Sequence, residues 1–254
     1  MQLTDYQDKY RCIHFARSDG VLEIRLHTRG EDARWGTSAQ SLHNELGLAC
    51  AEVAQDLDNR VIILTGTGDT FIAAMDREER APEPSLAAMW PRIYREGLAL
   101  LENLLALPVP VIAAVNGPAL IHAEIAVLSD IVLAAEHAEF ADLAHIPGGA
   151  VPGDGVHSVW PMLLGPNRGR YFLLTGERIP AREALRLGVV AEVLPPAELL
   201  PRARELAQQL ATLPPETLRH TRRLLVRQLR HRLRDELELG LAVEALAMLG
   251  GDAR

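Results

Sequence analysis

Residues 108–135 read PVPVIAAVNGPALIHAEIAVLSDIVLAA, and this stretch decides the fold class. Residues 111–115 are an apolar run that Asn116-Gly117-Pro118 ends, and residues 131–135 are a second run of the same kind. Between them, a short helix is expected from about His122 to Ser129. Strands that are apolar throughout and alternate with helices predict an α/β fold with right-handed crossovers between buried strands.

The N-terminal half extends this pattern. Residues 13–17 and 21–27 flank Asp19-Gly20, a pair that favours the two-residue turn of a β-hairpin. Thr37-Ser38 is predicted to cap a helix whose apolar face carries Leu42, Leu46, Ala49, Val53 and Leu57. Residues 60–66, RVIILTG, predict a further buried strand, and the apolar spacing over residues 86–105 predicts a helix.

The C-terminal half is predicted to be mostly helical. Helices are expected over residues 167–174 and 181–187, then a brief strand over 189–194, then three helices separated near Pro214 and Arg230. A composition change at Pro195-Pro196 divides the chain into a core of residues 1–195 and a helical region of residues 196–254. The polar, proline-containing residues 77–85 are expected to form a mobile flap.

Composition limits the class of protein. The 254 residues are 48% hydrophobic, enough for one large domain or one domain with a small extension. A net charge of -8 argues against nucleic acid as the main partner, and the arginine-rich residues 219–234 are interpreted as a packed helix with a charged outer face. The sequence has no long apolar run and no apolar leader, so a cytoplasmic protein with no membrane partner is expected. Cys12 and Cys50 are interpreted as reduced, buried thiols.

A second stretch, residues 144–160, carries the candidate chemistry: AHIPGGAVPGDGVHSVW. Its prolines and glycines can hold His145 and Asp154 in a rigid loop and fold the two side chains towards each other. A neutral imidazole beside a carboxylate is a general base for a water molecule. The alternative is a surface loop with a solvated aspartate and an incidental histidine.

Four stretches resemble the crotonase (enoyl-CoA hydratase/isomerase) superfamily in their order and spacing. They are RVIILTGTGDTFIAAMD (60–76), PVPVIAAVNGPAL (108–120), SDIVLAAEHAEFAD (129–142), and PGDGVH (152–157) followed by LLTGERIPAREALRLGVVAEVLPPAEL (173–199). The resemblance implies a spiral of ββα units over residues 1–195. It also implies a C-terminal region that covers the active site and mediates trimerisation, so that a homotrimer or a dimer of trimers is expected, with two backbone N–H groups that stabilise an oxyanion.

The departures from the superfamily pattern indicate different chemistry. Where typical members have a glycine triplet, this chain has Leu120-Ile121-His122, and His145 takes the position of the hydratase's catalytic glutamate. Together with Asp154, Trp35 and Glu244, these residues resemble the β-diketone hydrolases, the group of 6-oxocamphor hydrolase. The resemblance implies retro-Claisen hydrolysis, in which water attacks one carbonyl of a (bi)cyclic, non-enolisable 1,3-diketone and a keto acid is released.

This resemblance gives the site residues distinct expected roles. His145, oriented by Asp154, is expected to deprotonate water, and His122 is expected to donate a hydrogen bond to the oxyanion. Glu124 keeps the position of the superfamily's other carboxylate, and the direction of its side chain stays open.

Four further residues are candidates for the same site. Trp35 and Glu244 are candidates for orienting the second carbonyl and returning the proton, although Glu244 alone would also suit a solvated helix face. His43 is a candidate for lining the cavity beside Trp35, and Ala74 lies in a loop, residues 71–76, that resembles the first donor loop of CoA-binding members.

No cofactor is expected. No metal is expected either, because His122, Glu124, His145 and Asp154 lack the pair of histidines four residues apart that is typical of helical zinc sites. Two alternative functions remain. One is an acyl-CoA hydratase, isomerase or hydrolase, and the other is a catalytically silent member that acts in assembly or binds RNA through residues 219–234.

Overall fold

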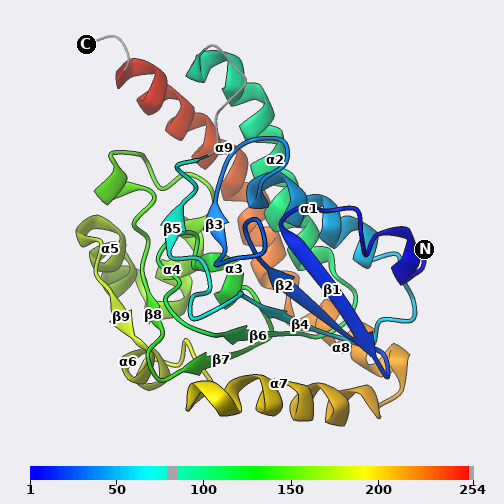
Figure 1. The fold of residues 1–254 in the computed structure, drawn as a ribbon. Helices are drawn as coiled ribbons and strands as arrows, with labels where there is room; N and C mark the ends of the chain where they lie inside the picture. Colours follow the sequence, from blue (N-terminus) through cyan, green and yellow to red (C-terminus); the bar gives the residue numbers. More distant parts are fainter. Residues whose placement is uncertain (79–84, 252–254) are drawn as a thin grey trace.

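The computed structural model describes residues 1–78 and 85–251, and its main sheet has six strands in the order β1-β2-β4-β6-β7-β10 (Figure 1). They are β1 (Ile13–Ser18), β2 (Val21–Leu26), β4 (Val61–Thr65), β6 (Val111–Val115), β7 (Ile131–Ala135) and β10 (Glu192–Leu194). β1 and β2 are antiparallel, and every other pair in this sheet is parallel. The prediction of an α/β fold with buried parallel strands is confirmed.

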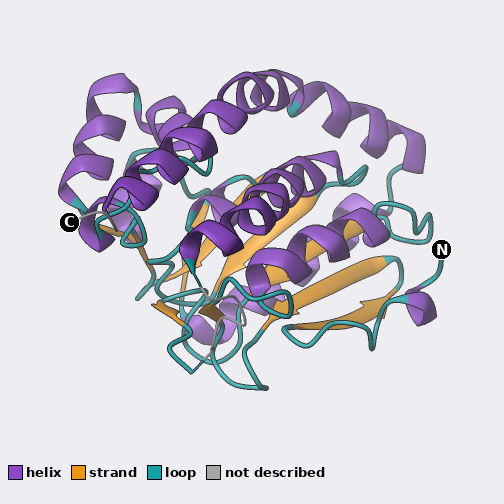
Figure 2. Cartoon of the chain, turned by 90° about the horizontal axis from the view of Figure 1, so that it is seen from above, coloured by secondary structure: helices purple, strands orange, loops and turns teal. Residues whose placement is uncertain are grey.

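Helices cover both faces of this sheet (Figure 2). One face packs against α1 (Leu42–Val53) and α2 (Leu86–Ala106), and the opposite face packs against α7 (Pro196–Ala211). All residues of β4 and β6 are buried because both faces are covered. The helical region expected from residue 196 therefore completes the core, since Leu199, Ala203 and Ala207 of α7 lie in a cluster with Ile63 and Ile112.

Two predictions near the N-terminus have different outcomes. The hairpin is confirmed, with φ of 51° at Asp19 and 79° at Gly20, the positive values that a two-residue turn of this kind requires. The cap predicted at Thr37-Ser38 was wrong, because the helix begins at Leu42 with Ser41 as its N-cap residue. Ser38 lies in a turn before the helix, where its hydroxyl accepts the Gln40 N–H. The prediction for Leu57 was wrong: it lies beyond the helix end and is 68% exposed.

Two small sheets were not predicted. β3 (Arg34–Trp35) pairs in parallel with β5 (Ala74–Met75), and β8 (Glu139–Phe140) pairs antiparallel with β9 (Ile179–Pro180). Strands of two residues are too short for an alternating pattern to be visible in the sequence. The first of these sheets nevertheless positions Trp35.

The middle of the chain follows the predictions in outline. α3 (Glu124–Val127) is shorter than expected, and α4 (Val156–Leu164) begins inside the segment interpreted as a loop. α5 (Pro166–Thr175) and α6 (Ala181–Arg186) lie where helices were predicted. The predicted flap falls mostly on residues 79–84, outside the described residues.

The three C-terminal helices are confirmed, as α7, α8 (Pro215–Leu225) and α9 (Arg227–Gly251). The last break lies at Val226 and not near Arg230. In the single chain, Leu224, Leu225, Leu239 and Leu246 on α8 and α9 are all more than half exposed. The expected homotrimer or dimer of trimers stays a prediction. Cys12 and Cys50 are both buried, as expected. No helix of the described part is long and apolar enough to cross a membrane.

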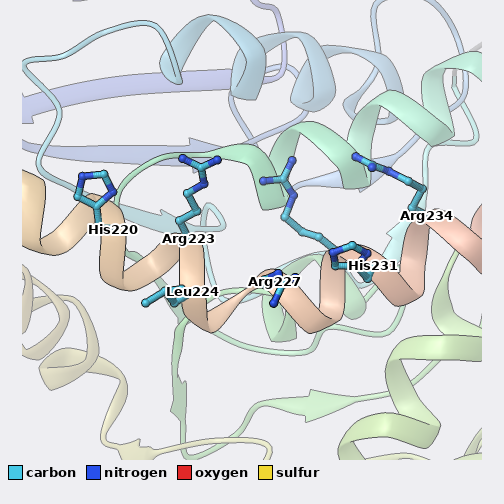
Figure 3. A pocket seen from close by; sticks show the side chains of 7 residues that line it. His220, Arg223, Leu224, Arg227, His231 and Arg234 are labelled. Atoms are coloured by element: carbon cyan, nitrogen blue, oxygen red, sulfur yellow. The ribbon is translucent and has the colours of Figure 1, made fainter.

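The arginine-rich residues 219–234 form parts of two helices, and their arginines do not all face outward. Arg223, Arg227, Arg230 and Arg234, with His220, Leu224 and His231, line a cavity of about 550 Å³ (Figure 3). Arg222 points inward instead and is 2% exposed. Its Nε donates to Asp130 at 2.6 Å, and its Nη atoms donate to the carbonyls of Leu104, Leu105 and Leu107 at the end of α2.

We expect the substitution Arg222→Ala to lower the free energy of unfolding by about 3–5 kcal/mol, because it removes the cation paired with the largely buried Asp130 carboxylate and the donor to several helix-end carbonyls. The measurement is urea unfolding followed by circular dichroism. Arg223→Ala is the matched control, since Arg223 is exposed on the same helix. Equal stability of the two variants would contradict the inward role of Arg222.

Candidate active site

The segments that follow β6 and β8 bring the candidate residues together. His122 lies two residues before α3, and Asp154 lies two residues before α4. His145 directly precedes a short 3-10 helix, Ile146–Gly148, and Glu244 approaches from α9. His122, His145 and Glu244 are all less than a tenth exposed, so the site is largely closed to solvent in this structure.

The two histidines and three carboxylates form one continuous chain of polar contacts. Asp142 Oδ1 lies 2.7 Å from His145 Nδ1, and Asp154 Oδ1 lies 3.3 Å from His145 Nε2. The other oxygen of Asp154 lies 2.9 Å from His122 Nδ1, and that nitrogen is also 2.9 Å from Glu124 Oε1. Asp154 therefore links the two imidazoles, while Asp142 and Glu124 hold one nitrogen of each ring.

The carboxylates control the charge of both rings. Burial disfavours an imidazolium, but Asp154 and Glu124 outweigh it and raise the pKa of His122 to about 10. Burial likewise opposes a charge on His145, yet Asp154 and Asp142 raise its pKa to about 12. Burial also works against the ionised form of Asp154, and the charges of His145 and His122 nevertheless hold its pKa well below its usual range.

These pKa shifts change the interpretation of His145. At neutral pH the cluster favours two imidazolium cations around the Asp154 carboxylate. The sequence interpretation assumed a neutral imidazole with one carboxylate partner, whereas His145 has two carboxylate partners, and both favour its charged form. Both rings are suited to stabilising negative charge on a substrate.

Glu244 has a pKa close to neutrality. Burial raises the pKa of Glu244 to about 7, with a further contribution from the charge of Asp154, while His145 and His122 oppose the shift. The helix comes this close because two glycines meet: a β-carbon at Gly153 or at Gly240 would collide with the carbonyl oxygen of the other. Glu244 follows Gly240 by about one helical turn, so this contact places its carboxylate beside Asp154.

Two backbone N–H groups just before His122 are already used in hydrogen bonds within the protein. The N–H groups of Leu120 and Ile121 both donate to the carbonyl of Ile72, at 2.9 and 3.1 Å. His122 itself has a φ of 52°, the left-handed region that glycine adopts most readily. Within the described residues, its Nε2 has no hydrogen-bond partner, so this ring atom can donate to a substrate oxygen.

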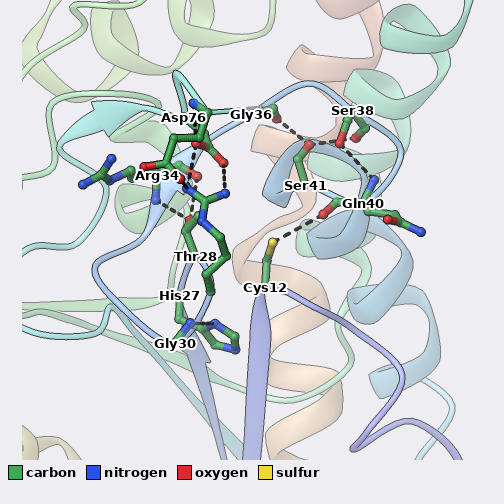
Figure 4. Close-up of polar contacts among 12 residues, drawn as sticks. Cys12, His27, Thr28, Gly30, Arg34, Gly36, Ser38, Gln40, Ser41 and Asp76 are labelled. Carbon is green, nitrogen blue, oxygen red and sulfur yellow. Dashed lines mark hydrogen bonds and ion pairs between the residues drawn. The ribbon is translucent and has the colours of Figure 1, made fainter. Parts of the chain in front are cut away.

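Trp35 stacks on the cluster. The centroids of the Trp35 and His122 rings are 4.0 Å apart, and the planes are tilted by 32°. The strand that carries Trp35 is held on both sides (Figure 4): the Arg34 N–H donates to the Thr28 hydroxyl at 2.8 Å, and the Ser41 hydroxyl donates to the Gly36 carbonyl at 2.6 Å. Trp35 therefore forms a rigid side of the site.

His43 contacts Trp35, and Ala74 lies on the strand that pairs with the strand of Trp35. The His43 ring meets the Trp35 ring edge to face with centroids 5.7 Å apart, and His43 Nδ1 lies 3.1 Å from Glu96 Oε2. Ala74 is exposed and pairs with Arg34 across the small sheet. His43 thus supports the tryptophan from α1, and Ala74 lies on the neighbouring strand.

Asp142 was missed by the sequence interpretation. The signal was present, since Asp142 and His145 are three residues apart in DLAH. Without the pairing of β8 with β9, the segment gave no sign that Asp142 turns inward. In the structure it is 1% exposed and makes the shorter of the two carboxylate contacts to His145.

Metal binding was not expected, yet three side chains have suitable ligand atoms. Those of His122, His145 and Asp154 all lie within 4.8 Å of one another. The facing nitrogen atoms of the two rings are directed at carboxylate oxygens in this arrangement. A metal ion bound between these facing atoms would compete with those carboxylate contacts.

Comparison with known proteins identifies the family. The family model described as enoyl-CoA hydratase/isomerase matches residues 16–245, and the chain belongs to this family. A β-diketone hydrolase from the cyanobacterium Anabaena sp. PCC 7120, solved with (S)-3-oxocyclohexyl acetic acid bound, is 42% identical, with a TM-score of 0.90 over 96% of both chains.

Other relatives have CoA-related names. An enoyl-CoA hydratase/isomerase from Mycobacterium paratuberculosis is 28% identical, with a TM-score of 0.83 over 94% of both chains. The carnitinyl-CoA dehydratase of Salmonella enteritidis PT4 is 35% identical over 209 residues, which are 80% of this chain and 76% of the relative. The crotonase-like fold and the resemblance to β-diketone hydrolases are therefore confirmed.

Proposed function

We propose that this chain hydrolyses a carbon–carbon bond of a (bi)cyclic, non-enolisable 1,3-diketone by retro-Claisen addition of water, giving a keto acid. The observation that carries the proposal is the imidazole pair around Asp154, in a loop where the Leu120 and Ile121 N–H groups are already bonded to Ile72. A thioester carbonyl in this superfamily needs backbone donors, whereas a compact diketone can reach the His122 imidazole directly.

The β-diketone hydrolase from Anabaena adds support. Its bound molecule, (S)-3-oxocyclohexyl acetic acid, carries a ketone and a carboxylic acid. Hydrolytic cleavage between the two carbonyls of a bicyclic 1,3-diketone generates these two groups. At 42% identity over 96% of both chains, the same reaction class is the proposal for this chain.

In the proposed reaction, water is held beside Asp154, whose Oδ1 has the 3.3 Å ion-pair contact with His145 Nε2 but accepts no hydrogen bond within the described structure. Ionised Glu244 takes one water proton as the oxygen attacks a substrate carbonyl, and His122 Nε2–H donates to the resulting oxyanion. The C–C bond then breaks, leaving a carboxylic acid and an enolate that the His145 and His122 charges stabilise. Glu244 returns its proton to the enolate carbon, so the sum is one diketone and one water giving one keto acid.

The curated relatives favour a second candidate, an acyl-CoA hydratase or dehydratase. One assay separates the two functions. The protein is incubated in deuterium oxide with a panel of bicyclic and monocyclic 1,3-diketones and, separately, with crotonyl-CoA. We expect keto acid with one deuterium at the carbon released as enolate, and no hydration of crotonyl-CoA. Hydration of crotonyl-CoA without turnover of any diketone would reverse the assignment.

A further inference from the structure

Asp142 is built into the site more rigidly than the other carboxylate that contacts His145. Its neighbours on both sides donate backbone hydrogen bonds to the segment that leads to His122: Ala141 N–H to the Ala119 carbonyl at 3.0 Å, and Leu143 N–H to the Leu120 carbonyl at 2.9 Å. Its side chain is 1% exposed, whereas that of Asp154 is 17% exposed. Asp142 is therefore fixed relative to the loop that carries the second histidine.

The two aspartates contact opposite nitrogens of His145. Asp142 Oδ1 lies 2.7 Å from Nδ1, within normal hydrogen-bond distance, and Asp154 Oδ1 lies 3.3 Å from Nε2. Asp154 also contacts His122 Nδ1, at 2.9 Å, so its position depends on both rings and it does not orient His145 by itself. The close contact of Asp142 fixes which nitrogen of the ring faces the centre of the site.

We propose that Asp142 is the positioning residue of His145: it accepts the Nδ1–H, prevents the ring from turning over, and keeps Nε2 directed at Asp154 and the reacting water. The proposal rests on the function proposed above. Asp142 touches no substrate in this scheme, and it acts through the orientation and charge of the ring. Burial opposes an imidazolium at this position, and the charge of Asp142 helps to raise the pKa of His145 against that penalty.

The test compares Asp142→Asn with the wild type by two independent measurements. The first is a titration of the His145 ring by nitrogen-15 NMR, with the signal assigned through His145→Ala. We expect the pKa of His145 to fall in Asp142→Asn, because the amide lacks the charge that stabilises the imidazolium. The second is steady-state turnover of a diketone, where kcat should fall roughly 10²-fold or more while KM stays nearly unchanged.

Asp56→Asn is the matched control, since Asp56 is also a buried aspartate with a side-chain partner, the Tyr6 hydroxyl at 2.8 Å. That variant should leave the titration of His145 and the turnover unchanged. A folded Asp142→Asn variant with wild-type His145 titration and kcat would overturn the proposal.

The NMR measurement also separates this proposal from the proposed reaction and from a folding failure. If no diketone is turned over, the His145 titration still reports on Asp142. If Asp142→Asn does not fold, the nitrogen-15 spectrum of the wild type tests the proposal instead. A His145 ring with a proton on Nδ1 in a strong hydrogen bond supports it. A neutral ring with its proton on Nε2 alone overturns it.

Discussion

Replacing Glu244 by glutamine should remove most of the activity and nearly all of its dependence on pH near neutrality. In the wild type, kcat/KM for a diketone should rise as pH increases through about 7, because only the ionised form of Glu244 can accept a proton from water. Loss of a general acid–base group costs roughly 10²–10⁴-fold in rate. The glutamine variant should therefore be slower by that factor, with a flat profile over this range.

The direction in which kcat/KM changes with pH follows from the direction of the pKa shift of Glu244. Burial and Asp154 raise the pKa of Glu244, so protonation inactivates the site at a higher pH than it would at an exposed glutamate. Because Asp154 and the two histidines interact with Glu244, the apparent pKa belongs to the cluster as a whole. Glu238→Gln, an exposed position on the same helix, is the control. A Glu244→Gln variant that kept the rise near pH 7 would place the proton transfer elsewhere.

The substitution His122→Ala should lower kcat by roughly 10²–10³-fold, the usual effect of removing one oxyanion donor. The expected loss is in kcat because the donor is needed most when negative charge develops on the substrate oxygen. Steady-state kinetics on a confirmed diketone, with circular dichroism to verify folding, makes the measurement.

The matched control for His122→Ala is His220→Ala, since the His220 side chain is 70% exposed on α8. Alanine at position 122 keeps the steric demand of a β-carbon at the same backbone conformation, so the comparison isolates the imidazole. Turnover within a few-fold of wild type would mean that another group stabilises the oxyanion.

The sequence predicted the parts of this molecule that depend on continuous patterns. Three apolar runs form strands of the main sheet, as predicted: Val61–Thr65, Val111–Val115 and Ile131–Ala135. A continuous apolar run identifies such a strand because both of its faces are covered by other parts of the core. The loop with His145 and Asp154 was identified because proline and glycine restrict its backbone. The structure brings His122, His145, Asp154 and Glu244 into one electrostatically linked group.

The sequence could not predict what depends on contacts between distant segments. Asp142 was missed because the number of carboxylates around a ring is a property of the folded site. The inward direction of Arg222 was missed for the same reason, since its partners Asp130 and the end of α2 are far away in the sequence. A basic residue in an arginine-rich helix gives no local sign that it is buried.

The left-handed backbone conformation of His122 lowers the stability of the fold, while its imidazole is needed for the proposed activity. A side chain at a φ of 52° costs about 1–2 kcal/mol relative to glycine, which adopts this region freely. Directed evolution that selects only for heat resistance would therefore favour glycine at position 122. Such a library would yield more robust proteins that have lost the imidazole, so any thermostabilisation of this scaffold needs a simultaneous selection for turnover.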